Sequence, residues 1–317
     1  MMRAILYAGQ GSQHTGMGKD LYETYPEFRE IFDDPDLDLD FDLKKACFEN
    51  PDDMLLQTQY TQPCMVAFAA GVTNIFRKRN LFADCVCGLS LGEYSALEAA
   101  EVFDATSAIK TAAFRGAAMA KAAEGIECGM SAVLGLSEDK LNSCCEAARE
   151  LGIVSICNYN CPGQLVIGGE KAAVDKCSAL ALEAGAKRCI PLAVSGPFHT
   201  SLMKPAGNAL KDYFKSLTFN PMKTPVLFNF LGRENDQDMT ISELLEYQVQ
   251  SSVKMEASIR RLFELGVREF IEVGPGKALS GFVKKTAKDM GISDFTCASV
   301  ETVDDVEALF DAQKVVA

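Results

Sequence analysis

The chain has 317 residues, enough for one large domain or two smaller ones, and 48% of them are hydrophobic and 24% charged, without a low-complexity tract. This composition argues against intrinsic disorder. The formal net charge of −13 argues against a nucleic-acid-binding protein, because neutralising phosphates requires a concentrated basic surface. The first apolar run is too short for a signal peptide, and no run approaches the roughly 20 apolar residues that span a bilayer. We therefore expect a cytoplasmic protein without membrane contact.

The first part of the chain alternates between strand and helix patterns. A short apolar run ending in glycine is typical of a buried strand, and longer runs rich in alanine and small residues are typical of packed helices. In chain order we expect a strand, two helices (the second with Pro63 in its first turn), a strand and two more helices, at residues 3–9, about 19–32, 61–79, 83–88, 91–100 and 104–123.

The pattern changes near residue 130. There we expect a strand, a helix, two strands, a helix and a strand, at residues 130–135, 137–150, 153–160, 164–169, 170–185 and 187–194. This β-α-β-β-α-β order within about 65 residues is the ferredoxin-like arrangement. A strand at residues 268–274 then returns the chain to an α/β pattern, which indicates that a small domain is inserted into a larger one.

Two local patterns and the cysteines resemble ligand sites, but their spacing does not fit. The glycine loop 9–19 has His14 where a dinucleotide fingerprint needs glycine, and Lys19 is followed by Asp20 where a P-loop needs Ser or Thr. The acidic run 33–43 lacks the glycine and the terminal glutamate of a calcium loop. The twelve cysteines indicate reduced thiols, and none of their pairs has a second ligand pair at zinc spacing. We therefore expect neither a metal nor a bound nucleotide.

Ser90 lies at the centre of a Gly-x-Ser-x-Gly pentapeptide, residues 88–92, on the turn between an expected strand and helix. Such a pentapeptide arises by chance in roughly one chain in ten of this length, so it is a weak signal alone. On such a turn, however, small neighbours allow a strained conformation that exposes the serine oxygen. The helix N-terminus adds its dipole, and the N–H of Leu91 becomes a candidate oxyanion donor, as do the amides of the first glycine loop. Ser90 is therefore either a nucleophile or a serine that happens to separate two glycines.

A serine nucleophile needs a base, and the chain has only two histidines, His14 in the first glycine loop and His199 after the small domain. His199 also fits a turn residue bonded to the backbone. Arg115 and Met119 share one face of the alanine-rich helix. Arg115 fits either a surface residue whose stem covers apolar neighbours or a bidentate clamp for a substrate carboxylate. The residues leave both alternatives open.

Seven motifs follow one another along essentially the whole chain: AGQGSQHTGMG, GLSLGEYSAL, FRGAAM, NYNCPGQLVIGG, GPFHT, YQVQSSV and EVGPGKALSGFVKK. With these motifs the sequence resembles the malonyl-CoA:acyl carrier protein transacylases of fatty acid synthesis and the related acyltransferase domains of polyketide synthases. It departs from the family pattern at Leu89, where histidine is common, and at Ala8, where proline is common. Neither position supplies a reacting group.

The resemblance implies a set of catalytic roles. Ser90 would take the malonyl group as an ester, and His199 would act first as its base and then as the acid that protonates the leaving thiolate. The backbone N–H groups of Gln10 and Leu91 would form the oxyanion hole. The carbonyl of Gln248 would orient His199.

The resemblance also implies a substrate cleft. Arg115 would pair with the free carboxylate of malonate, and Met119, Asn160, Gln164 and Phe198 would line the cleft. In this family, phenylalanine before the histidine accompanies malonyl rather than methylmalonyl substrates. Packing against one methyl group discriminates by only about 1 to 3 kcal/mol, so a preference is implied, not exclusivity.

The expected fold is thus α/β. It comprises a large α/β-hydrolase-like domain with a parallel sheet, residues 1–126 and 195–317, and a small ferredoxin-like domain, residues 127–194. We expect a monomeric acyltransferase that moves malonyl from malonyl-CoA to the phosphopantetheine thiol of acyl carrier protein by a ping-pong mechanism. No cofactor of its own is implied, since malonyl-CoA is a substrate and phosphopantetheine belongs to the partner.

Three alternatives remain open from the sequence. The same chemistry would serve a stand-alone enzyme that loads a polyketide synthase. A serine thioesterase or esterase usually carries its histidine near the C-terminus, whereas here residues 200–317 follow His199. A docking module could keep the motifs without turnover.

Overall fold

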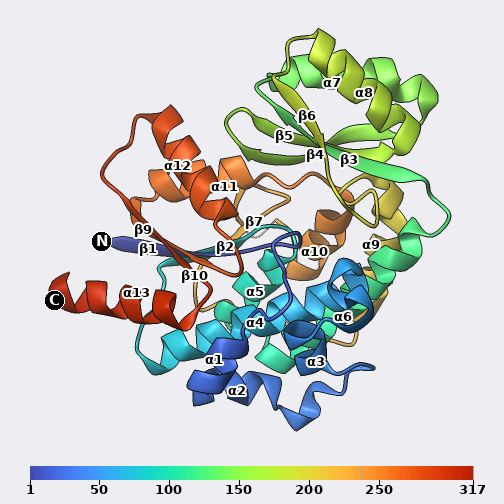
Figure 1. The fold of residues 1–317 in the computed structure, drawn as a ribbon. Helices are drawn as coiled ribbons and strands as arrows, with labels where there is room; N and C mark the ends of the chain where they lie inside the picture. Colours follow the sequence, from blue (N-terminus) through green and yellow to red (C-terminus); the bar gives the residue numbers. More distant parts are fainter. Residues whose placement is uncertain (237, 317) are drawn as a thin grey trace.

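The computed structural model describes residues 1–236 and 238–316, and it contains two separate sheets (Figure 1). The larger sheet has the strand order β10-β9-β1-β2-β7-β8, and its neighbouring strands are parallel except for β7 and β8. Its strands are β1 (Met2–Tyr7), β2 (Cys85–Gly88), β7 (Val226–Phe228), β8 (Arg233–Glu234), β9 (Val267–Val273) and β10 (Thr296–Val300).

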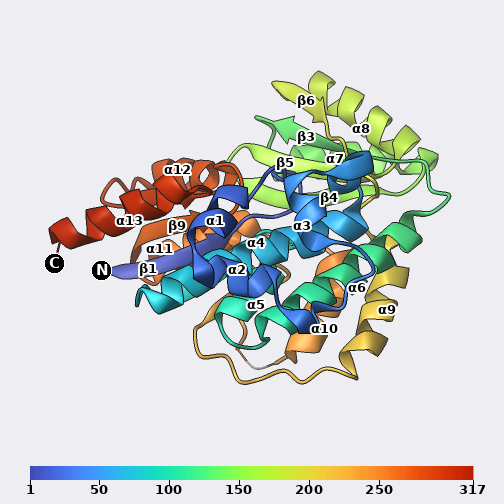
Figure 2. The ribbon, with the colours of Figure 1, turned by 60° about the horizontal axis from the view of Figure 1, so that its bottom comes forward.

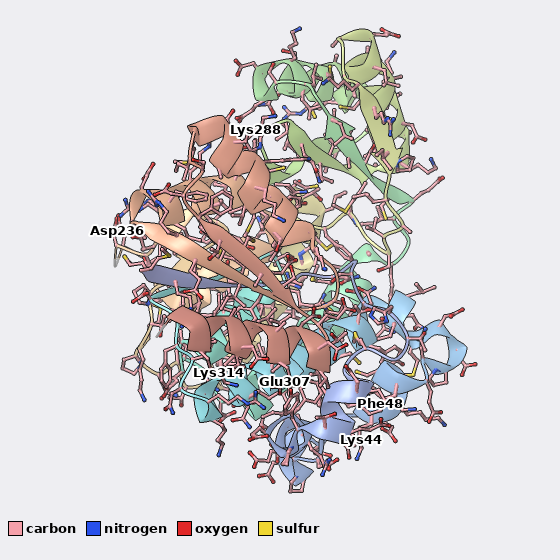
Figure 3. All side chains as sticks on the ribbon, turned by 60° about the vertical axis from the view of Figure 1, so that its left-hand side comes forward. Lys44, Phe48, Asp236, Lys288, Glu307 and Lys314 are labelled. Carbon is pink, nitrogen blue, oxygen red and sulfur yellow. The ribbon has the colours of Figure 1, made fainter. Side chains whose placement is uncertain are left out.

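Helices cover both faces of this sheet. They are α1 (Lys19–Thr24), α2 (Pro26–Phe32), α3 (Leu43–Phe48), α4 (Thr58–Lys78), α5 (Gly92–Ala99), α6 (Ala105–Ala123), α9 (Lys204–Phe214), α10 (Ile241–Gln250), α11 (Met255–Glu264), α12 (Ala278–Met290) and α13 (Val303–Val316). The two views place α9 and α10 beside α6, at the end of the molecule away from the termini (Figure 1 and Figure 2). Charged side chains such as Lys288 and Lys314 project outward from α12 and α13 (Figure 3).

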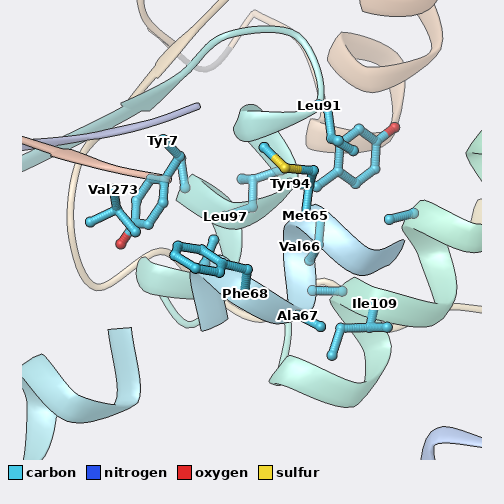
Figure 4. Close-up of a cluster of buried hydrophobic side chains, with 14 of the residues drawn as sticks. Tyr7, Met65, Val66, Ala67, Phe68, Leu91, Tyr94, Leu97, Ile109 and Val273 are labelled. Carbon is cyan, nitrogen blue, oxygen red and sulfur yellow. The ribbon is translucent and has the colours of Figure 1, made fainter. Parts of the chain in front are cut away.

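The larger sheet separates two hydrophobic clusters, because successive side chains along a strand point to opposite faces of the sheet. Ile5 and Tyr7 of β1 belong to the cluster formed with α4 and α5, whereas Ala4 and Leu6 belong to the cluster formed with α11 and α12. Figure 4 shows part of the first cluster, in which Tyr94 of α5 lies among apolar side chains of α4. The apolar run at the start of the chain is therefore buried on both faces, as is usual in a parallel sheet.

The smaller sheet is antiparallel, with the order β4-β5-β3-β6. Its strands are β3 (Cys128–Leu134), β4 (Val154–Cys161), β5 (Gln164–Glu170) and β6 (Arg188–Pro191), and its helices are α7 (Glu138–Ala148) and α8 (Lys171–Glu183). Both helices pack on the face that points away from the rest of the molecule (Figure 1). On the opposite face, Met130, Ala132 and Val166 join the core of the larger part.

The expected α/β architecture is confirmed, with a parallel-containing sheet and a separate antiparallel sheet. Some boundaries differ. The single helix expected at about 19–32 is interrupted at Tyr25, whose backbone is extended, because the residue before a proline avoids helical angles. The helix expected from residue 61 begins at Thr58, so Pro63 lies in its second turn instead of its first. No helix among the described residues is long and apolar enough to cross a membrane.

Candidate active site

Ser90 lies in the sharp turn between β2, which ends at Gly88, and α5, which begins at Gly92. Its φ angle of 53° is in the left-handed region, which residues with a side chain seldom occupy. A Cβ at Gly88 would collide with the main chain of Gly92, and a Cβ at Gly92 would collide with the carbonyl of Tyr7. The two glycines are therefore required by the close approach of β1, β2 and α5, and this packing leaves Ser90 half-buried at the end of the sheet.

His199 lies beside Ser90, and the Ser90 hydroxyl donates to His199 Nε2 at 2.6 Å. On the other side of the ring, His199 Nδ1 donates to the main-chain carbonyl of Gln248 at 2.8 Å. Because a carbonyl can only accept, this bond places the proton on Nδ1 and leaves Nε2 as an acceptor. Burial, and then the positive charge of Arg115, lower the pKa of His199 to about 4. The ring is therefore neutral and able to take the serine proton at neutral pH.

The second histidine lies elsewhere. His14 is half-exposed and its Nε2 is 2.6 Å from a carboxylate oxygen of Glu301, which raises its pKa. It therefore cannot serve as the base of Ser90 in this structure, and of the two histidines only His199 contacts the serine.

Arg115 is buried, with 1% of its surface exposed, so the alternative of a surface arginine is wrong. Its guanidinium donates to Gln62 Oε1 at 2.7 Å, to Gln248 Oε1 at 3.0 Å and to Ser90 Oγ at 3.2 Å. It also lies 5.3 Å from the centre of the Tyr94 ring, close enough for a cation–π contact. Neutral oxygens and an aromatic face thus hold the positive charge next to the serine hydroxyl.

The backbone amides of Gln10 and Leu91 were expected to form an oxyanion hole. Gln10 lines the cavity at Ser90, and its side-chain Oε1 accepts from Thr58 Oγ1 at 2.7 Å. Leu91 directly follows Ser90 in the turn of residues 88–92 between β2 and α5, here called the elbow, and its side chain is buried in the core beneath this turn. Within the described part of the chain, neither of these two amides donates to a protein acceptor. Both are therefore free to donate to an oxygen that develops negative charge beside Ser90.

A cavity of about 210 Å³ opens at Ser90, between the elbow and the smaller sheet. Met119 and Phe198 form part of its apolar wall, and Asn160 of β4 contributes a buried amide whose Oδ1 has no partner in the described residues. Gln164 is not among the lining residues; it lies at the start of β5, where its Oε1 accepts from Lys285 Nζ at 3.3 Å. This corrects the expectation that Gln164 lines the cleft together with Asn160.

A larger hollow of about 640 Å³ lies around Tyr159, Lys254 and Arg260. It contains neither Ser90 nor His199. The smaller cavity is the better candidate, because there a hydroxyl, a neutral imidazole and a buried guanidinium are in contact.

Sequence reasoning missed three buried residues that contact the site. Glu93 directly follows the pentapeptide and received no role, although its carboxyl group is fully buried. Gln62 bonds Arg115, and Asn229 bonds the backbone of Ser90 at 2.6 Å. The only signal for Asn229 was a single polar residue within an apolar run, LFNFL, where a strand was not expected.

Comparison with known proteins agrees with this geometry. The family model of the acyl transferase domain matches residues 5–309 of this chain. The chain is 41% identical to the malonyl CoA-acyl carrier protein transacylase of Bacillus subtilis over 295 residues, covering 92% of this chain and 93% of the relative. The crystal structure of the transacylase from Clostridium perfringens superposes with a TM-score of 0.93 at 36% identity, covering 100% and 98% of the two chains.

A further structure is PlMCAT, solved in complex with its type II PKS acyl-carrier protein. It superposes with a TM-score of 0.92 at 31% identity, covering 98% of this chain and 100% of the other. Sequence and fold match these relatives over nearly their full length, and the histidine and the arginine expected from the motifs both contact the serine. The chain therefore belongs to the acyl transferase family, among the malonyl CoA-acyl carrier protein transacylases.

Proposed function

We propose that this protein is an acyltransferase that moves the malonyl group from malonyl-CoA to the phosphopantetheine thiol of acyl carrier protein, and thereby supplies fatty acid biosynthesis. The contacts around Ser90 carry this proposal: a neutral imidazole at 2.6 Å and a buried guanidinium at 3.2 Å from the same hydroxyl oxygen. The first can activate a serine for acyl transfer, and the second suits an acyl group that bears a carboxylate.

In the first half-reaction, Ser90 Oγ attacks the thioester carbonyl of malonyl-CoA while His199 Nε2 takes the hydroxyl proton. The amides of Gln10 and Leu91 donate to the oxyanion of the tetrahedral intermediate. The intermediate collapses, the C–S bond breaks, and His199 returns the proton to the coenzyme A thiolate. The bond from His199 Nδ1 to the Gln248 carbonyl, 2.8 Å, supports this role because it holds the ring in one tautomer throughout.

In the second half-reaction, the phosphopantetheine thiol of acyl carrier protein enters the same cavity. His199 Nε2 takes the thiol proton, and the sulfur attacks the malonyl ester. When the C–O bond of the ester breaks, the proton passes to Ser90 Oγ and the enzyme returns to its starting state. The acyl group is thus exchanged between two thiols, and each proton transfer is assigned to His199.

Arg115 is proposed to bind the free carboxylate of the malonyl group. A buried guanidinium interacts more strongly with a carboxylate than an exposed one, because solvent does not screen the pair. Its neutral partners, Gln62 and Gln248, orient the guanidinium without neutralising it. Phe198 and Met119 occupy the apolar wall of the same small cavity, which supports a preference for malonyl over an acyl group with an α-methyl.

We propose a finer description of the fold as well. The order β4-β5-β3-β6 with two helices on one face supports a ferredoxin-like domain at residues 127–194, and the elbow at the end of a parallel strand supports an α/β-hydrolase-like domain at residues 1–126 and 195–317. We further propose a monomeric, cytoplasmic enzyme without a cofactor of its own.

The same chemistry would also load a polyketide synthase. This second candidate is favoured by the similarity to PlMCAT, whose partner is a type II PKS acyl-carrier protein. Comparing the transfer rate to carrier proteins of the two pathways would separate the candidates.

The proposed function can be tested by incubating the protein with malonyl-CoA, with and without acyl carrier protein. We expect mass spectrometry to find a malonyl ester on the Ser90 peptide without the carrier, and malonyl carrier protein when it is added. Rapid release of free malonate in both incubations would instead identify a thioesterase. Absence of any adduct and of any turnover would indicate a docking module.

A further inference from the structure

Asn229 lies immediately after β7, at the point where the parallel pairing with β2 stops. The register of the two strands matches Val86 with Val226 and Cys87 with Leu227. If the pairing continued, Leu89 would face Asn229. The main chain of β7 turns away instead, since the amides of residues 231 and 232 both donate to the carbonyl of Phe228.

The side chain of Asn229 makes the two bonds that the main chain would have made. In a parallel ladder, the carbonyl of a residue accepts from the amide of the residue that follows its partner. Its own amide donates to the carbonyl of the residue that precedes its partner. Asn229 Oδ1 accepts from the Ser90 amide at 2.6 Å, and Asn229 Nδ2 donates to the Gly88 carbonyl at 2.6 Å. These are the two residues that flank Leu89, so the side-chain amide extends the ladder by one step to the elbow.

Asn229 is itself held firmly. It is fully buried, its own amide donates to Glu93 Oε2 at 2.5 Å, and its carbonyl accepts from the amide of Lys254 at 2.9 Å. Glu93 belongs to the first turn of α5, directly after the elbow. Asn229 is therefore tied to the strand before the elbow, to the elbow itself and to the helix after it.

The carbonyl of Ser90 is held from another element. Gln248 Nε2 donates to it at 2.6 Å, while the main-chain carbonyl of Gln248 accepts from His199. The amide and the carbonyl of Ser90 are thus both fixed by buried side-chain amides, one from Asn229 and one from Gln248. A residue at a φ angle of 53° persists only where its surroundings hold it in this way.

We propose that Asn229 is a positioning residue for the acyl-transfer reaction, whose side-chain amide extends the β2–β7 ladder and holds Ser90 in the left-handed conformation that directs Oγ to His199. This rests on the proposed role of Ser90 as the nucleophile. Asn229 does not touch the substrate; it acts through the backbone of Ser90.

The test compares Asn229→Leu, which keeps the approximate volume but loses both bonds, with Asn74→Leu as a matched control. Asn74 is a partly buried asparagine on α4 whose Nδ2 donates to the carbonyl of Glu27. Two rates are measured for each folded, purified variant: malonyl transfer from malonyl-CoA to acyl carrier protein, and labelling of Ser90 by a fluorophosphonate. The second probe contains no malonyl group, so it reports serine activation even if the proposed substrate is wrong.

For Asn229→Leu we expect kcat and the labelling rate to fall about 100-fold, with KM for malonyl-CoA within about twofold of wild type, because misplacing a reacting atom by about 1 Å costs this much. The control should stay within about twofold for both rates. Labelling of Asn229→Leu at the wild-type rate would overturn the proposal. Wild-type protein that is labelled but transfers no malonyl would refute the proposed function alone.

A second variant, Asn229→Asp, keeps the proposal testable if the leucine variant does not fold. A neutral carboxyl can donate to the Gly88 carbonyl and accept from the Ser90 amide, whereas a carboxylate cannot donate. Glu93 is the ionisable group bonded to Asn229, and burial raises its pKa to about 8. The same burial should raise the pKa of a carboxyl introduced at position 229, which is fully buried as well. We expect the labelling rate of the variant, divided by that of wild type at each pH, to fall as pH rises. A ratio independent of pH would overturn the proposal.

Discussion

The cavity at Ser90 has two walls of different character. The wall from the larger part carries Ser90, Arg115 and His199, which are bonded to one another and to Gln248. The wall from the smaller sheet carries only neutral residues: Met130, Asn158, Asn160 and Val166. One wall therefore holds charged and titratable groups in fixed positions, and the other offers apolar surface and side-chain amides.

The difference extends to hydrogen bonding. On the first wall, Ser90 Oγ, both ring nitrogens of His199 and the terminal nitrogens of Arg115 already have partners. Such preorganised groups need not rearrange when charge develops in the transition state. On the second wall, the buried Oδ1 of Asn160 has no partner among the described residues. An unpaired buried acceptor is unfavourable, so a donor on the bound substrate is its natural partner. We infer that the first wall performs the reaction and the second contacts the neutral part of the acyl donor.

Ser90→Ala should have the largest effect, because it removes the proposed nucleophile. We expect malonyl transfer to fall by roughly 10³-fold or more, and the adduct on the Ser90 peptide to disappear in mass spectrometry. Ser143→Ala, on the exposed surface of α7, is the control and should retain wild-type activity. A persistent adduct in Ser90→Ala would move the nucleophile away from the first wall.

Arg115→Met should reduce the proposed selectivity for malonyl-CoA, since it removes the only positive charge that contacts Ser90 in the described structure. We expect the preference for malonyl-CoA over acetyl-CoA, measured as a ratio of kcat/KM, to fall about 10- to 100-fold, as for loss of a charged hydrogen bond of about 1.5 to 3 kcal/mol. Lys121→Met, on the exposed side of the same helix, is the control. An unchanged preference would refute the role of Arg115 as the carboxylate clamp.

The pH dependence of Ser90 labelling by a fluorophosphonate tests the electrostatics of the first wall. Burial, and then repulsion from Arg115, lower the pKa of His199 to about 4. Only the neutral ring can act as the proposed base, so labelling should stay constant above about pH 5.5 and decrease as pH falls through the pKa. In Arg115→Met the repulsion is absent, so the pKa of His199 should rise and the decrease in labelling should begin at a higher pH. If labelling of the wild-type protein decreased near pH 6.5 instead, the pKa of an unperturbed histidine, this prediction would be wrong.

Asn160→Ala should have the smallest effect, because the second wall binds without reacting. We expect KM for malonyl-CoA to rise about fivefold, equivalent to about 1 kcal/mol for one neutral hydrogen bond, with kcat nearly unchanged. Gln164→Ala is the matched control: it is an amide on the same sheet, yet it bonds Lys285 instead of lining the cavity, and it should leave both constants unchanged. A large loss of kcat in Asn160→Ala would remove the distinction between the two walls.

Much of the fold was predictable because it depends on local patterns. The apolar run at residues 3–9, the alanine-rich run at 104–123 and the strand–helix order of the small sheet can each be recognised from neighbouring residues. The turn at Ser90 was also predictable, since glycines on both sides of a serine between a strand and a helix leave few conformations. The break at Tyr25 has a local cause as well, because the residue before a proline avoids helical angles.

The residues that contact Ser90 could not be predicted from local patterns, because they lie far from it along the chain. His199 is 109 residues away, and Asn229 and Gln248 are 139 and 158 residues away along the chain. From the residues alone, Arg115 fitted the surface as well as the interior, and the resemblance to a family supplied the roles, including a cleft position for Gln164 that the structure corrects.

The sequence by itself therefore determined the elements, the elbow and the residue types available for acyl transfer. The tertiary structure decided which histidine reaches the serine, that Arg115 is buried beside it, and that Asn229 completes the ladder where β7 turns away. The physical reason is that periodicity and turn preference act over a few neighbouring residues, whereas the site forms only where the order of the strands brings distant segments together.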